Sequence, residues 1–475
     1  MSKLTRTLAL VATLAMASSA LVACGGTTES STAPAASTAE STAESAAESV
    51  EESAAESVEE SAADPAPASD LTNDDATLTV VCWTDADLAN MFDVYAEQGL
   101  QSEGVEVTYQ NCGGNGSEAM TQYATYLNSG DDVDLFVAEA GWILNYINDD
   151  SFSAPLSDLG ITEADYSDAY KYTVEIGTDN NGVLKAASWQ AAAGGYAYNA
   201  DLAKEYLGVE PDDTDAMQAK VADWSKFEAT AKELKDASNG EVKIAATIGG
   251  LWQAFSTAKN APWVDGTTIK TDVAKEFTDM VKGYVDNGYV DASIEQWTPD
   301  WTNAGLNGKA LGYFYSTWCL GEGAQLEQNG GNAGNWRIIN GPQTFFWGGS
   351  WLCLSPNCNT KLEAQKFIKA FTADKATMKA YALYSGDFAN NKAAMEEIVA
   401  EGSNSNALLG GQDQFAVLSD VAANIKMSDS ISKYDQSLKD TFLTALKDNI
   451  SEDTDTILSK FTADALAANP DLSAE

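Results

Sequence analysis

The chain has 475 residues, of which 71 are acidic, 27 are basic and none is histidine, so its formal net charge is −44. Without histidine, nucleophilic catalysis with an imidazole base and zinc sites with imidazole ligands are excluded. The acidic balance also makes nucleic acid and anionic lipid headgroups poor partners. The chain is instead rich in tryptophan, with twelve such residues, and indole rings beside carboxylates and amides suit neutral polyhydroxy ligands or organic cations. We expect no nucleic-acid partner, no cofactor and no metal site.

The first 24 residues predict an export signal. Lys3 and Arg6 give a basic start, and residues 8–17 are apolar. An apolar run this short is typical of a signal peptide rather than of a spanning helix. The sequence Leu-Val-Ala-Cys-Gly around Cys24 resembles the lipobox of bacterial lipoproteins. That resemblance implies that Cys24 is lipidated and anchors an exported protein to the outer face of the bacterial cytoplasmic membrane; a plain secretory signal is the alternative.

Residues 25–75 consist mainly of Ser, Thr, Ala, Glu and Pro and contain the octad AAESVEES twice, at residues 46–53 and 54–61. Without large apolar residues such a segment cannot offset its ordering entropy. We therefore predict a disordered acidic tether. The 400 residues that follow exceed one ordinary core and predict two domains.

Three predicted strands, at residues 78–82, 105–109 and 134–138, alternate with amphipathic helices. This order predicts a mainly parallel sheet. Ligands of such sheets meet residues just past the carboxyl ends of the strands. The candidates at those positions are Trp83, Asp85, Glu139 and Trp142. Each has an alternative interpretation as a helix cap or a core aromatic.

Residues 185–201, with the sequence KAASWQAAAGGYAYNAD, interrupt a predicted strand with small residues and with Gly194-Gly195. Paired glycines inside a strand mark a close backbone approach or a bend. We predict that the chain crosses here between two lobes, with Trp189 and Gln190 on the floor of a cleft. An ordinary sheet strand with a glycine bulge is the alternative.

In the second half of the chain, aromatic residues again follow predicted strands. A predicted strand at residues 242–248 precedes Trp252, and one at residues 311–315 precedes Trp318. Residues 344–354, with Trp347 and another glycine pair, predict a second crossing, and two crossings fit discontinuous lobes joined by a hinge. The remaining candidate contacts are Trp347 itself and Asp387, in a loop. Packing or rim positions are assigned to Trp263, Trp297, Trp301 and Trp336.

Two disulfide bonds are possible in an exported protein with these cysteines. Cys353 and Cys358 flank a short turn, and Cys82 and Cys112 each follow a predicted parallel strand. The alternative is that all of them, together with Cys319, are small buried thiols.

Four segments in order carry a family resemblance. They are residues 189–203, 223–227, 307–318 and 348–371, which contain the motifs Tyr-Ala-Tyr-Asn-Ala-Asp-Leu, Asp-Trp-Ser-Lys-Phe, Gly-Lys-Ala-Leu-Gly-Tyr-Phe and Gly-Gly-Ser-Trp-Leu-Cys-Leu-Ser. With these motifs the chain resembles the extracellular solute-binding proteins of family 1, the carbohydrate-binding components of ABC importers related to maltose-binding protein.

The resemblance implies a two-lobe α/β fold of the periplasmic-binding-protein type, with hinge crossings and a helical C-terminal tail. One lobe is expected to comprise residues 76–190 and 350–400, and the other residues 191–349 and 401–475. The implied function is to bind a mono- or oligosaccharide between the lobes by indole stacking and to deliver it to an ABC permease, as a monomer without enzymatic activity. By position, the implied contacts include Glu139 or Trp142, Trp189, Gln190, Trp252 and Trp318.

Two other functions fit parts of the same pattern. An organic cation such as a polyamine or a quaternary ammonium would use the indoles as a cation cage, with Asp85, Glu139 and Asp387 as counter-charges. A surface glycosidase would need two paired carboxylates, and acidic residues this numerous form such pairs by chance.

Overall fold

The computed structural model describes residues 71–83, 86–114, 116–128, 132–259, 261–321, 323–426 and 431–475. The predicted signal peptide with Cys24, the predicted tether up to residue 70, and the candidate contact Asp85 lie outside these residues. Within the described ranges, no helix combines the length and the apolar character needed to cross a membrane.

The first sheet contains the three strands expected from the start of the folded region. Its strand order is β2-β1-β3-β11-β4. The strands are β1 (Thr77–Cys82), β2 (Glu106–Asn111), β3 (Leu135–Glu139), β4 (Ala186–Ser188) and β11 (Ser350–Leu354). β1 pairs in parallel with β2 and β3, as predicted, whereas β11 inserts antiparallel between β3 and β4. A segment from far along the chain therefore completes this sheet.

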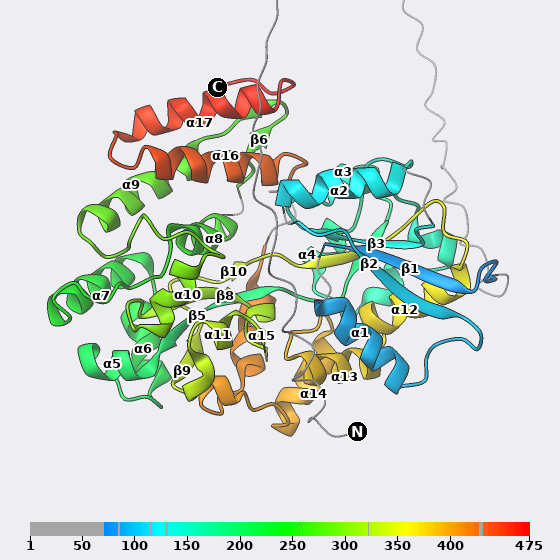
Figure 1. Cartoon of the computed structure of the whole chain (residues 1–475), viewed down its shortest axis with the longest axis horizontal. Helices are drawn as coiled ribbons and strands as arrows, with labels where there is room; N and C mark the ends of the chain where they lie inside the picture. The colour runs from blue at the N-terminus through cyan, green and yellow to red at the C-terminus, as the bar shows by residue number, and fades with distance from the viewer. Residues whose placement is uncertain are drawn as a thin grey trace, which may run out of the picture. The chain divides into compact units, whose positions relative to one another are not determined.

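The second sheet is antiparallel and centred on β5. Its members are β5 (Ala193–Asn199), β8 (Gly312–Ser316), β9 (Trp336–Ile339) and β10 (Phe345–Phe346). β5 pairs antiparallel with each of the other three. Almost every residue of these strands is buried. In Figure 1 these strands lie to the left and β1, β2 and β3 to the right.

The chain passes between the two sheets twice. Residues 189–192 join β4 of the first sheet to β5 of the second, with Ala192 at φ 48°, and residues 347–349 join β10 to β11 on the way back. The two crossings contact each other, because the Trp347 amide donates to the Ala192 carbonyl at 3.0 Å. Both predicted crossings are thus present in the strand connectivity.

The predicted role of Gly194 and Gly195 needs correction. They lie inside β5 rather than at the crossing. A Cβ atom on Gly194 would stand 2.0 Å from Phe345 Cε2, and one on Gly195 would stand 2.9 Å from Ile338. The glycine pair therefore permits close approach of neighbouring strands, while the change of direction comes just before it.

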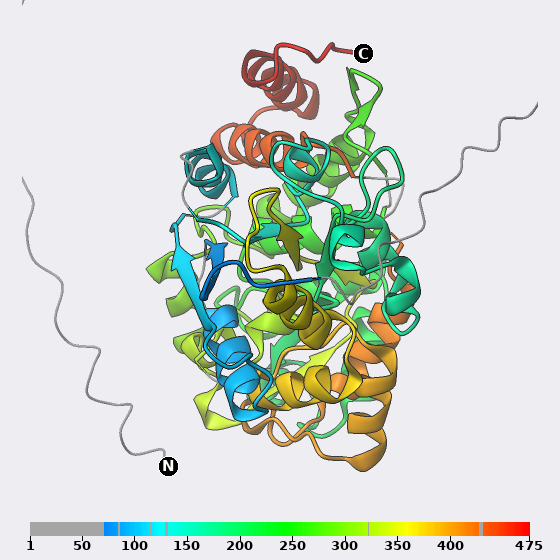
Figure 2. The same cartoon turned by 90° about the vertical axis from the view of Figure 1, so that its right-hand side faces the viewer.

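Helices cover both sheets. Near the first sheet they are α1 (Ala86–Glu97), α2 (Gly116–Asn128), α3 (Leu144–Ile147), α4 (Lys171–Ile176), α12 (Lys361–Thr372), α13 (Lys375–Ser385) and α14 (Lys392–Glu401). Around the second sheet they are α5 (Ala200–Leu207), α6 (Thr214–Val221), α7 (Trp224–Ala237), α8 (Ile248–Ala258), α9 (Asp272–Asp286), α10 (Pro299–Leu306) and α11 (Gln325–Gln328). The tail comprises α15 (Gln414–Asn424), α16 (Asp435–Asp448) and α17 (Thr454–Ala468), as the helical pattern predicts. α1, α12 and α13 pack on one another, on the side that Figure 2 turns toward the viewer.

The predicted strand at residues 242–248 is wrong. Lys243 makes only an isolated bridge to Ala310, although Leu311 N donates to Lys243 O at 2.7 Å. The Thr247 hydroxyl then accepts a hydrogen bond from Gly250 N at 3.0 Å and caps α8. Because the cap starts the helix here, Trp252 lies within α8 rather than beyond a strand end.

Neither predicted disulfide bond forms. Cys112, Cys353 and Cys358 are free thiols, as is Cys319. Cys353 belongs to the hydrophobic cluster on one face of the first sheet and Cys358 to the cluster on the other face. Cys112 and Cys82 likewise lie on opposite faces of the sheet. Cys353 and Cys358 are close in sequence, and Cys82 and Cys112 end neighbouring strands, but in each pair the two side chains point to different faces.

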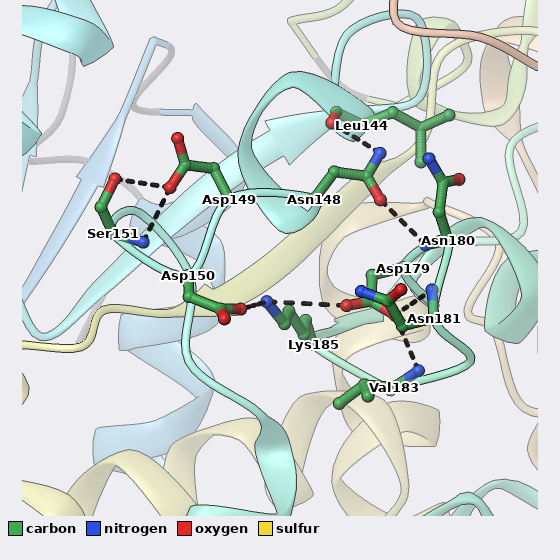
Figure 3. Close-up of polar contacts among 10 residues, drawn as sticks. All are labelled: Leu144, Asn148, Asp149, Asp150, Ser151, Asp179, Asn180, Asn181, Val183 and Lys185. Atoms are coloured by element: carbon green, nitrogen blue, oxygen red, sulfur yellow. Dashed lines mark hydrogen bonds and ion pairs between the residues drawn. The ribbon is translucent and has the colours of Figure 1, made fainter. Parts of the chain in front are cut away.

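A buried lysine fixes the hairpin that leads into β4 (Figure 3). Lys185 is 1% exposed, and its Nζ forms ion pairs with Asp150 and, at 3.7 Å, with Asp179 Oδ2. Asp179 Oδ1 also accepts from the backbone amides of Asn181 and Val183, each at 2.8 Å. This carboxylate therefore closes the turn and neutralises the lysine at the entry to the first crossing.

Candidate functional site

Trp318 and Trp347 meet where β8 ends beside the second crossing. A 3-10 turn, Thr317–Cys319, follows β8 and presents Trp318. Trp318 Nε1 donates to the Trp347 carbonyl at 3.2 Å, and Ser316 Oγ donates to the same oxygen at 2.9 Å. The two ring centroids are 5.5 Å apart at an interplanar angle of 72°. Both indoles are half-buried, so each keeps surface available to a ligand.

Trp297 joins these two rings, although sequence reasoning assigned it to packing or to the rim. Its ring centroid lies 6.0 Å from that of Trp318, in a stacked arrangement of 27°, and 6.0 Å from that of Trp347. Its side chain is 50% exposed and its backbone has φ 66°. A non-glycine residue held in that region costs on the order of 1–3 kcal/mol. No sequence pattern signals such a conformation.

Trp83 and Trp142 lie together beyond the ends of β1 and β3, as the parallel sheet predicts. Their centroids are 5.4 Å apart at 71°, and both rings contact Tyr123. Trp142 is 1% exposed whereas Trp83 is half-buried. In this group Trp83 has the accessible indole, and the buried ring of Trp142 packs against it.

Glu139 ends β3 and faces helix α16. Its Oε2 accepts a hydrogen bond from Gly141 N at 3.1 Å. Burial raises the pKa of the Glu139 carboxyl, an effect opposed by the nearby charge of Lys439 and by the Gly141 hydrogen bond. Asp435, in the first turn of α16, has its pKa raised to about 7, also mainly by burial. These carboxyl groups can accept hydrogen bonds from ligand hydroxyls or, when protonated, donate them.

Asp387 and Gln190 form a buried hydrogen-bond network with Thr317, the residue that follows strand β8 of the second sheet. Gln190 Nε2 donates to Asp387 Oδ2 at 2.9 Å, and Phe388 N and the Thr317 hydroxyl both donate to Oδ1. Burial raises the pKa of Asp387 to about 7, and the charge of Asp87 raises it further. Because both carboxylate oxygens are occupied, Asp387 holds the first crossing to the turn that carries Trp318.

Asp87 is a titratable group that sequence reasoning missed. It lies in the first turn of α1, two positions beyond the predicted contact Asp85. Burial raises its pKa to about 6. Its charge also acts on the hydroxyl of Tyr381 in α13. The signal available in the sequence was its position just past β1, the same signal that selected Asp85.

The other two predicted contacts lie in packed interiors. Trp189 is 1% exposed and belongs to the cluster that covers one face of the first sheet. Trp252 is 2% exposed and packs against Trp263, Phe277 and Phe442 at centroid distances of 5.4, 5.0 and 4.7 Å. Their roles as ligand contacts stay predictions. In the described part of the chain, no three Cys, Asp or Glu side chains come together as a metal site would require.

Comparison with known proteins identifies the family. A family model described as bacterial extracellular solute-binding protein matches residues 90–407, more than half of the chain. The chain belongs to the bacterial extracellular solute-binding proteins. Membership in this family implies an exported protein whose task is to bind a solute. A search of curated proteins finds no match.

Solved structures of solute-binding proteins share the fold. An extracellular solute-binding protein of family 1 matches with a TM-score of 0.70 and 17% identity, over 83% of this chain and 100% of that chain. An ABC-transporter-associated binding protein from B. animalis subsp. lactis, in complex with β-1,6-galactobiose, has a TM-score of 0.66 and 17% identity, over 84% and 99%. The galacto-N-biose-/lacto-N-biose I-binding protein from Bifidobacterium longum, in complex with lacto-N-biose, has 0.63 and 16%, over 84% and 98%. The predicted fold of the periplasmic-binding-protein type, with its helical C-terminal region, is confirmed.

Proposed function

We propose that this protein is the substrate-binding component of an ABC importer and binds a mono- or oligosaccharide between two lobes. The observation that carries the proposal is the pair of half-buried indoles, Trp318 and Trp347, beside both crossings. Sugar rings present C–H groups to indole faces and hydroxyls to carboxylates and amides. Two relatives of the same fold were solved with disaccharides bound, which supports this ligand class.

The proposed contacts come from both sheets. Trp318 and Trp347 would stack on the sugar from the second-sheet side, while Trp83 and Glu139 would face it from the first. Gln190, Trp142 and Asp387 would position these groups. Trp189 and Trp252 would contact the sugar only if the interior of their own lobe rearranged, because each packs against residues of a single lobe. We assign residues 76–190 and 350–400 to one lobe and residues 191–349 and 401–475 to the other.

Delivery to the permease completes the proposed function. Hinge motion at the two crossings would close the lobes over the sugar, and the loaded protein, a monomer, would dock on the transmembrane subunits. We further propose that lipidated Cys24 anchors the protein to the membrane and that the predicted tether ends before Asn73, because Asn73 pairs with Thr360 in the folded region. The lipid anchor is checked by mass spectrometry of the membrane fraction, where a Cys24→Ala variant should lose the acyl groups and move to the soluble fraction.

Binding is tested by thermal shift and calorimetry with maltose, β-1,6-galactobiose and lacto-N-biose. We expect at least one saccharide to raise the unfolding temperature, as any ligand that binds only the folded state does. Trp318→Ala should weaken its affinity by roughly tenfold or more, because a stacking aromatic acts as a binding hot spot. Leu306→Ala, at an exposed position at the end of α10, is the control and should change nothing. Normal affinity in Trp318→Ala would contradict the proposed site.

An organic cation is the second candidate ligand, favoured by Asp87 and Asp387. Each of these carboxyls has a pKa raised by burial, Asp87 adds to the shift of Asp387, and within the described residues neither forms an ion pair. A protonated amine beside Asp87 would offset this negative charge without displacing the donors that hold Asp387, and an indole face would add cation–π attraction. Binding of spermidine or choline that weakens steeply between low and high salt would favour this candidate, whereas salt-independent binding of a sugar excludes it.

A further inference from the structure

Trp297 stands out as the only exposed tryptophan among the described residues. We propose that Trp297 is a ligand contact, and that its indole forms one aromatic surface with Trp318 and Trp347 on which a ring of the saccharide stacks. This inference rests on the proposed function and adds to it a residue that neither the motifs nor the strand-end positions single out.

The three indoles converge from three separate segments. Trp297 precedes α10, Trp318 follows β8, and Trp347 lies in the second crossing. The Trp297 ring stacks on Trp318 at 6.0 Å and 27°, and the buried ring of Trp301 lies 5.0 Å from it on the inner side. The inner side of Trp297 is therefore fixed by other rings, while half of its surface faces solvent.

The start of helix α10 does not require an indole at position 297. Thr298 caps α10 and Pro299 begins it, so a glycine or asparagine at 297 would lead into the helix without strain at φ 66°. An exposed indole also adds little to a hydrophobic core. Strained residues of this kind persist where surrounding contacts hold them for a function, and the contacts here are the two indoles of the proposed binding surface.

The chemistry of the surface fits a sugar ring. Large aromatic faces bind apolar groups over a wide area, and an indole fixed by neighbouring rings loses little freedom when the ligand arrives. With Trp297 included, the aromatic surface extends from the crossing toward solvent, so it suits a ring of an oligosaccharide next to the one that Trp318 contacts.

The test compares Trp297→Gly and Trp297→Phe with Leu306→Ala in the full-length exported protein. Calorimetry with maltose, β-1,6-galactobiose and lacto-N-biose measures affinity, and thermal unfolding without sugar measures stability. We expect Trp297→Gly to weaken binding of the recognised saccharide about tenfold and to keep the unfolding temperature within about 3 °C of the wild type. Trp297→Phe should retain most of the affinity, and the control should change neither quantity.

Each other outcome has a definite meaning. Unchanged affinity in Trp297→Gly overturns the inference, and tighter binding overturns it too, since the indole would then cover Trp318 instead of contacting sugar. If Trp318→Ala weakens binding while Trp297→Gly does not, the proposed function stands and only this inference fails. If no saccharide binds the wild type, the proposed function fails and the inference that rests on it fails with it. If a saccharide binds, a loss of more than about 5 °C in Trp297→Gly shows that Trp297 serves the fold and overturns the inference.

Discussion

Asp387 links the first crossing to the turn after β8 through hydrogen bonds. The residue is 3% exposed, and the donors to its carboxylate are neutral: the Gln190 amide, the Thr317 hydroxyl and the Phe388 backbone. Neutral donors stabilise the charged form less than a cation would. Burial therefore dominates, and the raised pKa of about 7 follows, with Asp87 adding its own charge.

The raised pKa of Asp387 predicts a pH-dependent stability. The folded protein binds this proton more tightly than the unfolded chain does, so the contribution of Asp387 to stability is largest below about pH 4. It is lost as the pH rises from there through about 7. Asp387→Asn mimics the protonated form, so we expect it to remove about 2–3 kcal/mol of the loss in unfolding free energy between pH 5 and pH 8. Urea denaturation of the wild type and of Asp387→Asn at pH 5 and pH 8 measures this difference in unfolding free energy.

Neighbouring titratable groups also affect the pKa of Asp387, and they provide a second variant for the same test. Asp87 from α1, Tyr381 from α13 and Cys319 after β8 share its electrostatic surroundings. Asp87→Asn should lower the pKa of Asp387 and reduce the pH dependence without abolishing it. A wild-type protein equally stable at pH 5 and pH 8, with a parallel profile for Asp387→Asn, would show that this carboxyl keeps an ordinary pKa in the fold.

At the scale of an element, the hairpin before β4 depends on Lys185. Its ammonium is buried between Asp150 and Asp179, and the side chain of Asp179 is only 3% exposed (Figure 3). Lys185→Met would leave the Asp179 carboxylate buried without a cation. Breaking one partner of a buried pair costs about 3–5 kcal/mol, and we expect an unfolding free energy reduced by that amount in urea denaturation.

An exposed lysine supplies the control for this prediction. Lys171 pairs with Glu175 one helical turn away and is 87% exposed, so Lys171→Met should change stability by less than about 1 kcal/mol. The double variant Lys185→Met/Asp179→Asn should recover part of the loss, because it removes the unpaired charge. Equal effects of the two single lysine variants would contradict the role of the buried pair.

The elements also show where sequence patterns succeed and fail. β1, β2 and β3 were predictable because apolar runs alternate with amphipathic helices. The partners of β11 were not, since its insertion between β3 and β4 depends on contacts across 160 or more residues of chain. The sequence of residues 242–248 is typical of a strand. In the structure, Lys243 forms one bridge to Ala310, and the Thr247 cap then starts helix α8.

At the scale of the whole molecule, motif order predicted the fold and the two crossings, whereas much of the candidate site required coordinates. Strand-end positions predicted where Trp83, Trp142 and Trp318 lie along the chain, but the contacts of Trp83 with Trp142 and of Trp318 with Trp347 are findings of the structure. Trp297 could not be found in this way, because its φ of 66° and its stacking on Trp318 arise only when distant segments assemble. The depth at which Trp252 is buried also depends on packing that no local pattern records.

The net charge of −44 predicts how the whole molecule responds to salt. Many lysines are already paired at the surface, for example Lys232 with Asp236 at 2.6 Å and Lys275 with Asp279 at 2.7 Å, and such pairs contribute little. The unpaired acidic excess repels itself more in the compact state than in the expanded chain. Raising NaCl from about 10 mM to about 500 mM shortens the screening length from about 30 Å to below 8 Å, so we expect the unfolding temperature measured by calorimetry to rise by several degrees. Sorbitol at equal osmolality separates screening from solute exclusion. A fall in unfolding temperature with salt would mean that the ion pairs, rather than the acidic excess, dominate the electrostatic free energy of this protein.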